Sequence, residues 1–258
     1  MPRWTGVLAA TLMSSGCIFE AQTRSDAFSV EEEIVGVVVN VGAGDLEVIG
    51  TSIEGAEIFQ QLEWSGREPD STISVQDGIL TVSLTCRAGQ LVCRADHELI
   101  VPEGAWLQLE TGSGELDIKG TDADIAAGTG AGSIVLASAS GFADLETGSG
   151  DVLLMDVAGD IVVSTGSGLI SGSGLAAGLL QANTGSGDVE LSLSVLQGGV
   201  DISTGSGDVE LAVPRGSYAV DVSTGAGKVR VDGISDDPGA PRWIEVDTGS
   251  GDVHLEGN

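Results

Sequence analysis

The sequence predicts an all-β fold, a single-stranded parallel β-helix (solenoid) of roughly 18–20-residue coils with an irregular N-terminal β cap. Three observations predict it: a glycine-rich repeat, stretches in which polar and apolar residues alternate, and 40 glycines but only 3% aromatic residues among 258. A core with so few rings has to be filled by repeated small branched side chains. That favours a narrow, regular stack over one large globular core.

The repeat is the tetrapeptide Thr-Gly-(Ser or Ala)-Gly, which occurs eight times at spacings of 18 to 24 residues. A weaker copy spans Val41–Gly44. Self-similarity at this period is the signature of a solenoid, in which each coil is stabilised by its neighbours. The eight copies begin at Thr111, Thr129, Thr147, Thr165, Thr184, Thr204, Thr224 and Thr248.

Short alternating stretches follow and precede each copy of the repeat. Asp188–Leu191 and Val200–Ser203 both alternate polar and apolar residues. Period-two alternation is typical of a strand with one buried face, so each coil is expected to hold at least two strands joined by glycine turns. The parity places Thr204 inward. The repeated threonines are therefore expected to stack at a buried corner as a hydroxyl ladder, which is a structural role.

The residue after the glycines is expected to form a column of charges along the stack. In sequence order Lys228 falls between Asp208 and Asp252, where it would relieve the repulsion of carboxylates one coil apart. Asp188 and Asp208 are left without a counter-charge. Either a calcium ion bridges them or both face water, and they are the only metal candidates. No other cofactor is expected.

The N-terminal residues are expected to direct export. A short positive start and an apolar run too short to span a bilayer precede Ser15-Gly16-Cys17. This resembles the lipobox of bacterial lipoproteins, with Ser14 in place of the usual leucine, and implies that Cys17 is lipidated. The alternative is simple cleavage and release. The expected parts are a signal peptide (1–16), a lipid-anchored tether (17–27), the irregular β region or cap (28–106) and the solenoid repeats (107–258).

The other two cysteines are expected to pair. The segment from Thr81 to Pro102 reads as strand, short loop and strand, which could place Cys86 and Cys93 across a hairpin. Disulfides persist in exported proteins, so a bond is predicted, and two free thiols are the alternative.

The formal net charge of −29 limits the classes of partner that the protein is expected to bind. It argues against nucleic acid and against anionic lipid, both of which need lysine and arginine. It favours divalent cations or basic partners, and the alternative is a solvated surface with no ligand. The last stretch, Asp252–Leu255, reads as a strand with an open edge. End-to-end self-association at this C-terminal coil is one hypothesis, and protection of the edge by charges is the other.

The residues resemble the bacterial "putative adhesin" family of cell-envelope proteins of unknown function. The resemblance lies in Gly44–Val48, in Leu99–Gly104 and in the repeats from Thr111 onward, and it covers about residues 28 to 258. It implies a parallel β-helix and an envelope location. Ile18 after the cysteine favours the outer membrane, by analogy with enteric sorting.

Four functions are weighed. The first is a non-enzymatic, lipid-anchored structural or interaction protein with an unknown protein or glycan partner. The second is a calcium-binding solenoid, although single aspartate columns rarely supply six oxygens. The third is a carbohydrate-active enzyme, which would need acidic and basic residues converging on long loops. The fourth is ice binding by a threonine array, although each coil has only one such threonine, next to glycine.

Overall fold

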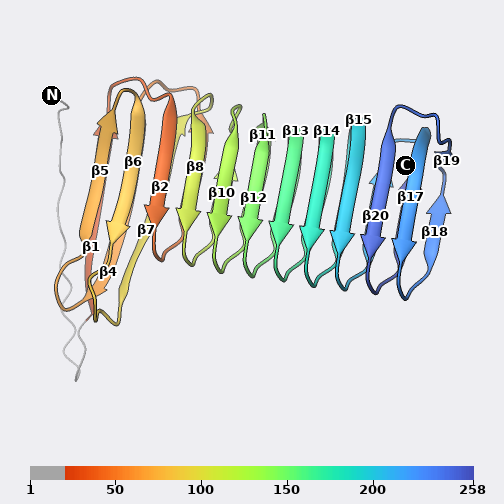
Figure 1. The fold of residues 1–258 in the computed structure, drawn as a ribbon. Coiled ribbons are helices and arrows are strands. Elements are labelled where there is room, and N and C mark those ends of the chain that lie inside the picture. Colours follow the sequence, from red (N-terminus) through yellow and green to blue (C-terminus); the bar gives the residue numbers. More distant parts are fainter. Residues whose placement is uncertain (1–20) are drawn as a thin grey trace. The chain divides into compact units, whose positions relative to one another are not determined.

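The structure is a computed structural model that describes residues 21–258 (Figure 1). These residues form 21 strands and no helix, so the all-β prediction is confirmed for them, and no helix in this range could span a membrane. Residues 1–16 and Cys17 lie outside the described residues. The chain divides into two compact units, Met1–Gly130 and Ala131–Asn258.

The first unit holds two rows of strands. In one row β2 lies between β6 and β8, and β8 also pairs with β10; in the other β3 lies between β7 and β9, and all these pairs are parallel. The strands are β1 (Ala21–Val30), β2 (Gly36–Val41), β3 (Leu46–Thr51), β4 (Ala56–Ser65), β5 (Asp70–Gln76), β6 (Ile79–Thr85), β7 (Cys93–Pro102), β8 (Trp106–Thr111), β9 (Leu116–Lys119) and β10 (Ile125–Thr129).

Antiparallel strands extend both rows at one end of this unit. β5 pairs with β6, while β4 pairs with β7 and β1 pairs with β4. The core is aliphatic: Val37, Val39, Val48 and Leu109 are fully buried. The disulfide between Cys86 and Cys93 is present. It is not a hairpin bond as expected, because it closes the loop between β6 and β7, which belong to different rows.

The second unit is a stack of parallel strands. The strands are β11 (Ile134–Ser140), β12 (Ala143–Thr147), β13 (Val152–Thr165), β14 (Ile170–Thr184), β15 (Val189–Thr204), β16 (Val209–Val213), β17 (Ser217–Thr224), β18 (Val229–Asp232), β19 (Ser235–Asp236), β20 (Trp243–Thr248) and β21 (Val253–Gly257). Ile134 pairs with Val152, Val152 with Ile170, and Ile170 with Val189. These side chains are all fully buried, so the apolar positions of neighbouring coils line up as predicted.

The order of the last coils differs from the order of the sequence (Figure 1). β20 lies between β15 and β17, and β21 lies between β16 and β18. The sequence expectation for the charged column was therefore wrong, because Asp252 lies between Asp208 and Lys228. Every coil carries the same inward pattern, so the pattern fixes which residues face the core but not which coil lies next to which. The segment after β18 supplies the length that lets the chain turn back.

A buried tyrosine joins β17 to the segment that leads back to β20. Tyr218 is fully buried and its hydroxyl donates to the carbonyl oxygen of Pro214 at 2.5 Å. The guanidinium of Arg242, on the returning segment, lies 4.4 Å from the ring centroid. Burial raises the pKa of Tyr218, which keeps the hydroxyl a donor.

The C-terminal strand is not an open edge. β21 has a neighbour on each side, which removes the reason for placing end-to-end association there. Within the described strands the open edge of this unit belongs to the coil of β17 and β18.

Candidate functional site

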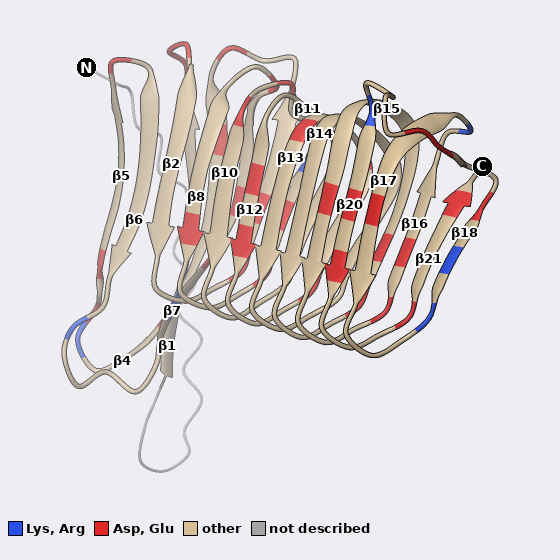
Figure 2. Cartoon of the chain, turned by 45° about the vertical axis from the view of Figure 1, so that its right-hand side comes forward, with Lys and Arg blue, Asp and Glu red and all other residues tan. Residues whose placement is uncertain are grey.

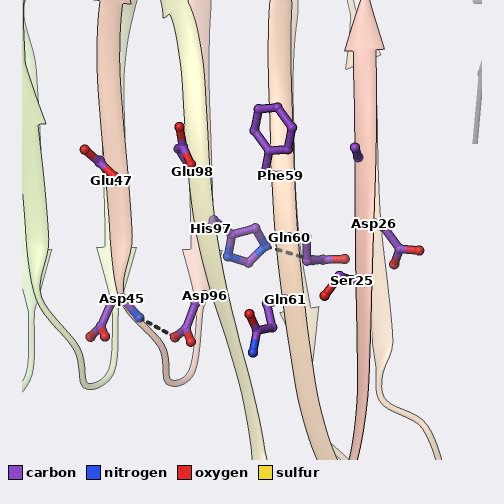
Figure 3. A pocket seen from close by; sticks show the side chains of 11 residues that line it. Ser25, Asp26, Asp45, Glu47, Phe59, Gln60, Gln61, Asp96, His97 and Glu98 are labelled. Atoms are coloured by element: carbon purple, nitrogen blue, oxygen red, sulfur yellow. Dashed lines mark hydrogen bonds between the residues drawn. The ribbon is translucent and has the colours of Figure 1, made fainter. Parts of the chain in front are cut away.

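A hollow of about 520 Å³ lies along β1, β4, β7 and β3 of the first unit (Figure 3). Its lining is mostly acidic and polar, with one aromatic ring. The lining residues are Ser25, Asp26, Ala27, Asp45, Glu47, Phe59, Gln60, Gln61, Asp96, His97 and Glu98.

Strand alternation brings the exposed lining residues to one face. On β3, Leu46 and Val48 point into the core and leave Glu47 outward, and Glu98 is its partner on β7. Phe59 on β4 lies opposite Glu98, and its side chain is 43% exposed. The face therefore presents an aromatic ring next to a row of carboxylates.

Three cations compensate part of this charge, and the first is Arg24, whose Nε lies 2.7 Å from an oxygen of Asp26. The guanidinium of Arg94 lies 2.7 Å from an oxygen of Asp96 and 3.6 Å from one of Asp45, and the hydrogen bond to Asp96 raises the pKa of Arg94. Lys119 donates to Glu47, which raises the pKa of that lysine. No ion pair within residues 21–258 includes Glu98, so the uncompensated charge lies next to Phe59.

A buried polar cluster lies on the same strands. His97 is 4% exposed, and its Nε2 lies 2.8 Å from Nε2 of Gln60. An amide nitrogen only donates, so Nε2 of His97 accepts and the proton is on Nδ1, which has no hydrogen-bond partner. Burial lowers the pKa of His97 from 6.5 to about 4, so the ring is neutral at pH 7. Ser71 bonds Gln60, and among the described residues no hydrogen bond joins a serine to His97.

The side chains that line the hollow offer groups suited to binding. Its exposed groups are carboxylates, the amide of Gln61, a hydroxyl and a phenyl ring, while the buried His97 is hydrogen-bonded to Gln60. The sequence analysis missed this site. One feature of the sequence could have indicated it. In the alternating pattern of β4, the apolar Phe59 occupies an outward position and the polar Gln60 an inward one, the reverse of what a strand with one buried face normally shows.

The repeated threonines are structural, but not as a hydroxyl ladder. Seven of the eight are at most 5% exposed, and Thr224, in the edge coil, is half-buried. Each hydroxyl donates at 2.9–3.5 Å to the carbonyl of the last glycine in a neighbouring coil's motif. The hydroxyls therefore bond to backbone rather than to one another.

Asp188 and Asp208 use their carboxylates in a similar way. Oδ1 of Asp188 accepts the N–H of Asp208 at 2.8 Å, and Oδ1 of Asp208 accepts the N–H of Asp252 at 2.7 Å. Across the described residues, no group of three or more metal-ligating side chains is found. The aspartate after the glycines thus bonds one coil to the next.

The family model described as Toastrack DUF4097 matches residues 19–256. No curated protein matches the chain.

Two solved structures share the fold. One is described as a putative adhesin from Parabacteroides distasonis ATCC 8503, with a TM-score of 0.54 and 16% identity, covering 90% of this chain and 96% of that one. The other is described as a putative adhesin from Parabacteroides merdae ATCC 43184, with a TM-score of 0.50 and 14% identity, covering 90% of this chain and 95% of that one. At these identities the similarity concerns the fold.

Proposed function

The chain belongs to the Toastrack DUF4097 family, and from this premise we propose that it is a non-enzymatic, adhesin-like interaction protein of the bacterial cell envelope. The parallel stack offers long rows of outward side chains on a rigid scaffold. The two solved structures of the same fold carry adhesin descriptions, which supports a binding role.

The N-terminal sequence supports the proposed location. Lipidation of Cys17 would anchor the protein in the outer membrane, and residues 17–27 would act as the tether. This is tested by fractionation after Cys17→Ala. Loss of membrane association supports the anchor, and unchanged association contradicts it.

The single observation that carries the binding role is the hollow around Phe59. An exposed ring beside polar and charged groups is the usual composition of a recognition surface, with an aromatic centre and a polar rim. The occupant is a protein or a glycan that offers apolar surface to Phe59 and hydrogen-bond donors to Glu98 and its neighbours. The net charge argues against an anionic ligand such as nucleic acid.

The other functions have less support. A calcium solenoid would need the oxygens of Asp188 and Asp208, which accept backbone N–H groups instead. A carbohydrate-active enzyme would need a reactive pair, and His97 is neutral, buried and bonded to Gln60.

The binding role is tested by recovering envelope components on the full-length protein as bait and comparing Phe59→Ala with Ile53→Ala. Ile53 is 40% exposed, close to the 43% of Phe59, and is not part of the hollow. Loss of a captured component with Phe59→Ala alone supports the proposal. Equal capture by both variants and the unchanged protein overturns it.

A further inference from the structure

The coil formed by β17 and β18 ends the second unit with its apolar side uncovered. β18 pairs with β21 on one side and with no described strand on the other. Val229 is 46% exposed and Val231 42%, although their partners on β21, Val253 and Leu255, are at most 1% exposed. These two valines occupy core positions of the repeat, and they lack only the next strand.

The outward positions of β18, together with Lys228 directly before it, carry both signs of charge. Lys228, Arg230 and Asp232 alternate with the two valines (Figure 2 shows basic residues on β18). Arg230 donates to Asp232, which also lies 3.3 Å from Nε2 of His254. The outer face of the edge therefore carries two positive charges followed by one negative charge. The second positive group, Arg230, is already paired with Asp232.

We infer that two copies of this chain associate through the open edge of β18, paired antiparallel about Arg230. Identical edges meet around a two-fold axis, which makes the strands antiparallel. Val229 then lies opposite the partner's Val231, so both exposed valines are covered. Lys228 lies opposite the partner's Asp232, twice in each dimer.

The occupant is a second copy because the edge is complementary to itself. In the antiparallel dimer, Lys228 of each copy faces Asp232 of the other, which gives two attractive pairs. The two Arg230 side chains face each other and repel, but each remains paired with Asp232 of its own chain. An unprotected edge strand tends to pair with a strand of another molecule. Here the charged side chains favour one register of that pairing.

A cysteine placed on the axis tests the register in the cell envelope. Arg230→Cys brings two cysteines directly opposite each other, at the separation across which antiparallel strands form disulfides. We expect a dimer on non-reducing gels, and none with Ser203→Cys, an exposed outward position on β15 away from the edge. Equal cross-linking of both variants, or of neither, overturns the inference.

Charge exchange tests the pairing without a new bond. With the full chain carrying Cys17→Ala, sedimentation should show that Lys228→Asp and Asp232→Lys each raise the dimer dissociation constant at least about tenfold, because each puts like charges opposite. Mixing the two variants should restore a heterodimer. Thermal melting checks that each variant folds. A monomeric unchanged protein, or a mixture that fails to associate, overturns the inference.

Discussion

At the scale of single residues, the glycines of the repeat serve close approach of one backbone to the next. A Cβ added at Gly187 would lie 1.9 Å from the carbonyl oxygen of Gly168, and one at Gly44 would lie 1.9 Å from that of Ala95. From the sequence alone these glycines are expected to form turns. Their role also includes leaving room for the neighbouring coil, which a pattern from one coil cannot show.

Substitution of two glycines in the same turn distinguishes close backbone approach from a general need for glycine in the turn. Gly44→Ala should lower the free energy of unfolding by about 3 kcal/mol, because the methyl group meets backbone and Gly44 has φ of 130°. Gly42→Ala should be nearly neutral, because nothing lies within 4 Å of its added Cβ. Urea unfolding measures both, and equal losses would contradict the explanation.

His97 predicts a dependence of stability on pH. Its pKa is about 4 in the folded protein and near 6.5 when unfolded, so only the unfolded chain gains a proton between these values. This contribution is fully present above pH 6.5 and is lost as the pH falls. Urea unfolding should show about 2 kcal/mol less stability at pH 5 than at pH 7.

His97→Gln is the control for that measurement. Glutamine keeps an acceptor for Gln60 but does not titrate, so the loss between pH 7 and pH 5 should largely disappear. A variant with the same slope as the unchanged protein would assign the effect to other groups.

At the scale of elements, aspartate side chains bond neighbouring coils together at several turns. Asp45, Asp151, Asp188 and Asp208 each accept a backbone N–H from the following coil in the stack. Lys228 stands at this position in the edge coil, where none of the described coils follows. Leu169 stands at the same position inside the stack and has no carboxylate, so the bond is made in some coils and not in others.

Asp208 tests this bond. Asp208→Ala should lower the free energy of unfolding by about 1 kcal/mol, because the N–H of Asp252 loses its acceptor. Asp208→Asn keeps an oxygen at the same place and removes a like charge, so it should lose less. Thermal and urea unfolding distinguish the two, and an equal loss for both variants would rule out the acceptor role.

The strands were predictable where the pattern is local. Period-two alternation correctly places Val189, Val209 and Val253 inward, because burial depends on parity alone. It could not place β20 and β21 between earlier coils, because the same inward pattern fits any neighbour. The polar cluster of His97 and Gln60 was also missed, since it depends on pairing between β4 and β7, which are distant in sequence.

At the scale of the whole molecule, the net charge of −29 opposes compact structure. Figure 2 shows acidic residues spread over many strands and basic ones in few places. Raising NaCl from about 20 mM to about 0.5 M should therefore raise the melting temperature, because screening weakens this repulsion more than the few exposed ion pairs. A melting temperature that falls with salt would mean that the ion pairs dominate.

The position of β20 and β21 has a consequence for how the protein is made. Residues 217–236 leave the ribosome before the strands that separate them from β15 and β16. Coils up to β16 can be added one by one as the chain emerges, but the next coil has no final neighbour yet. That coil can take its final position only after β20 and β21 have paired beside it. Synthesis and assembly therefore run in different orders at this point.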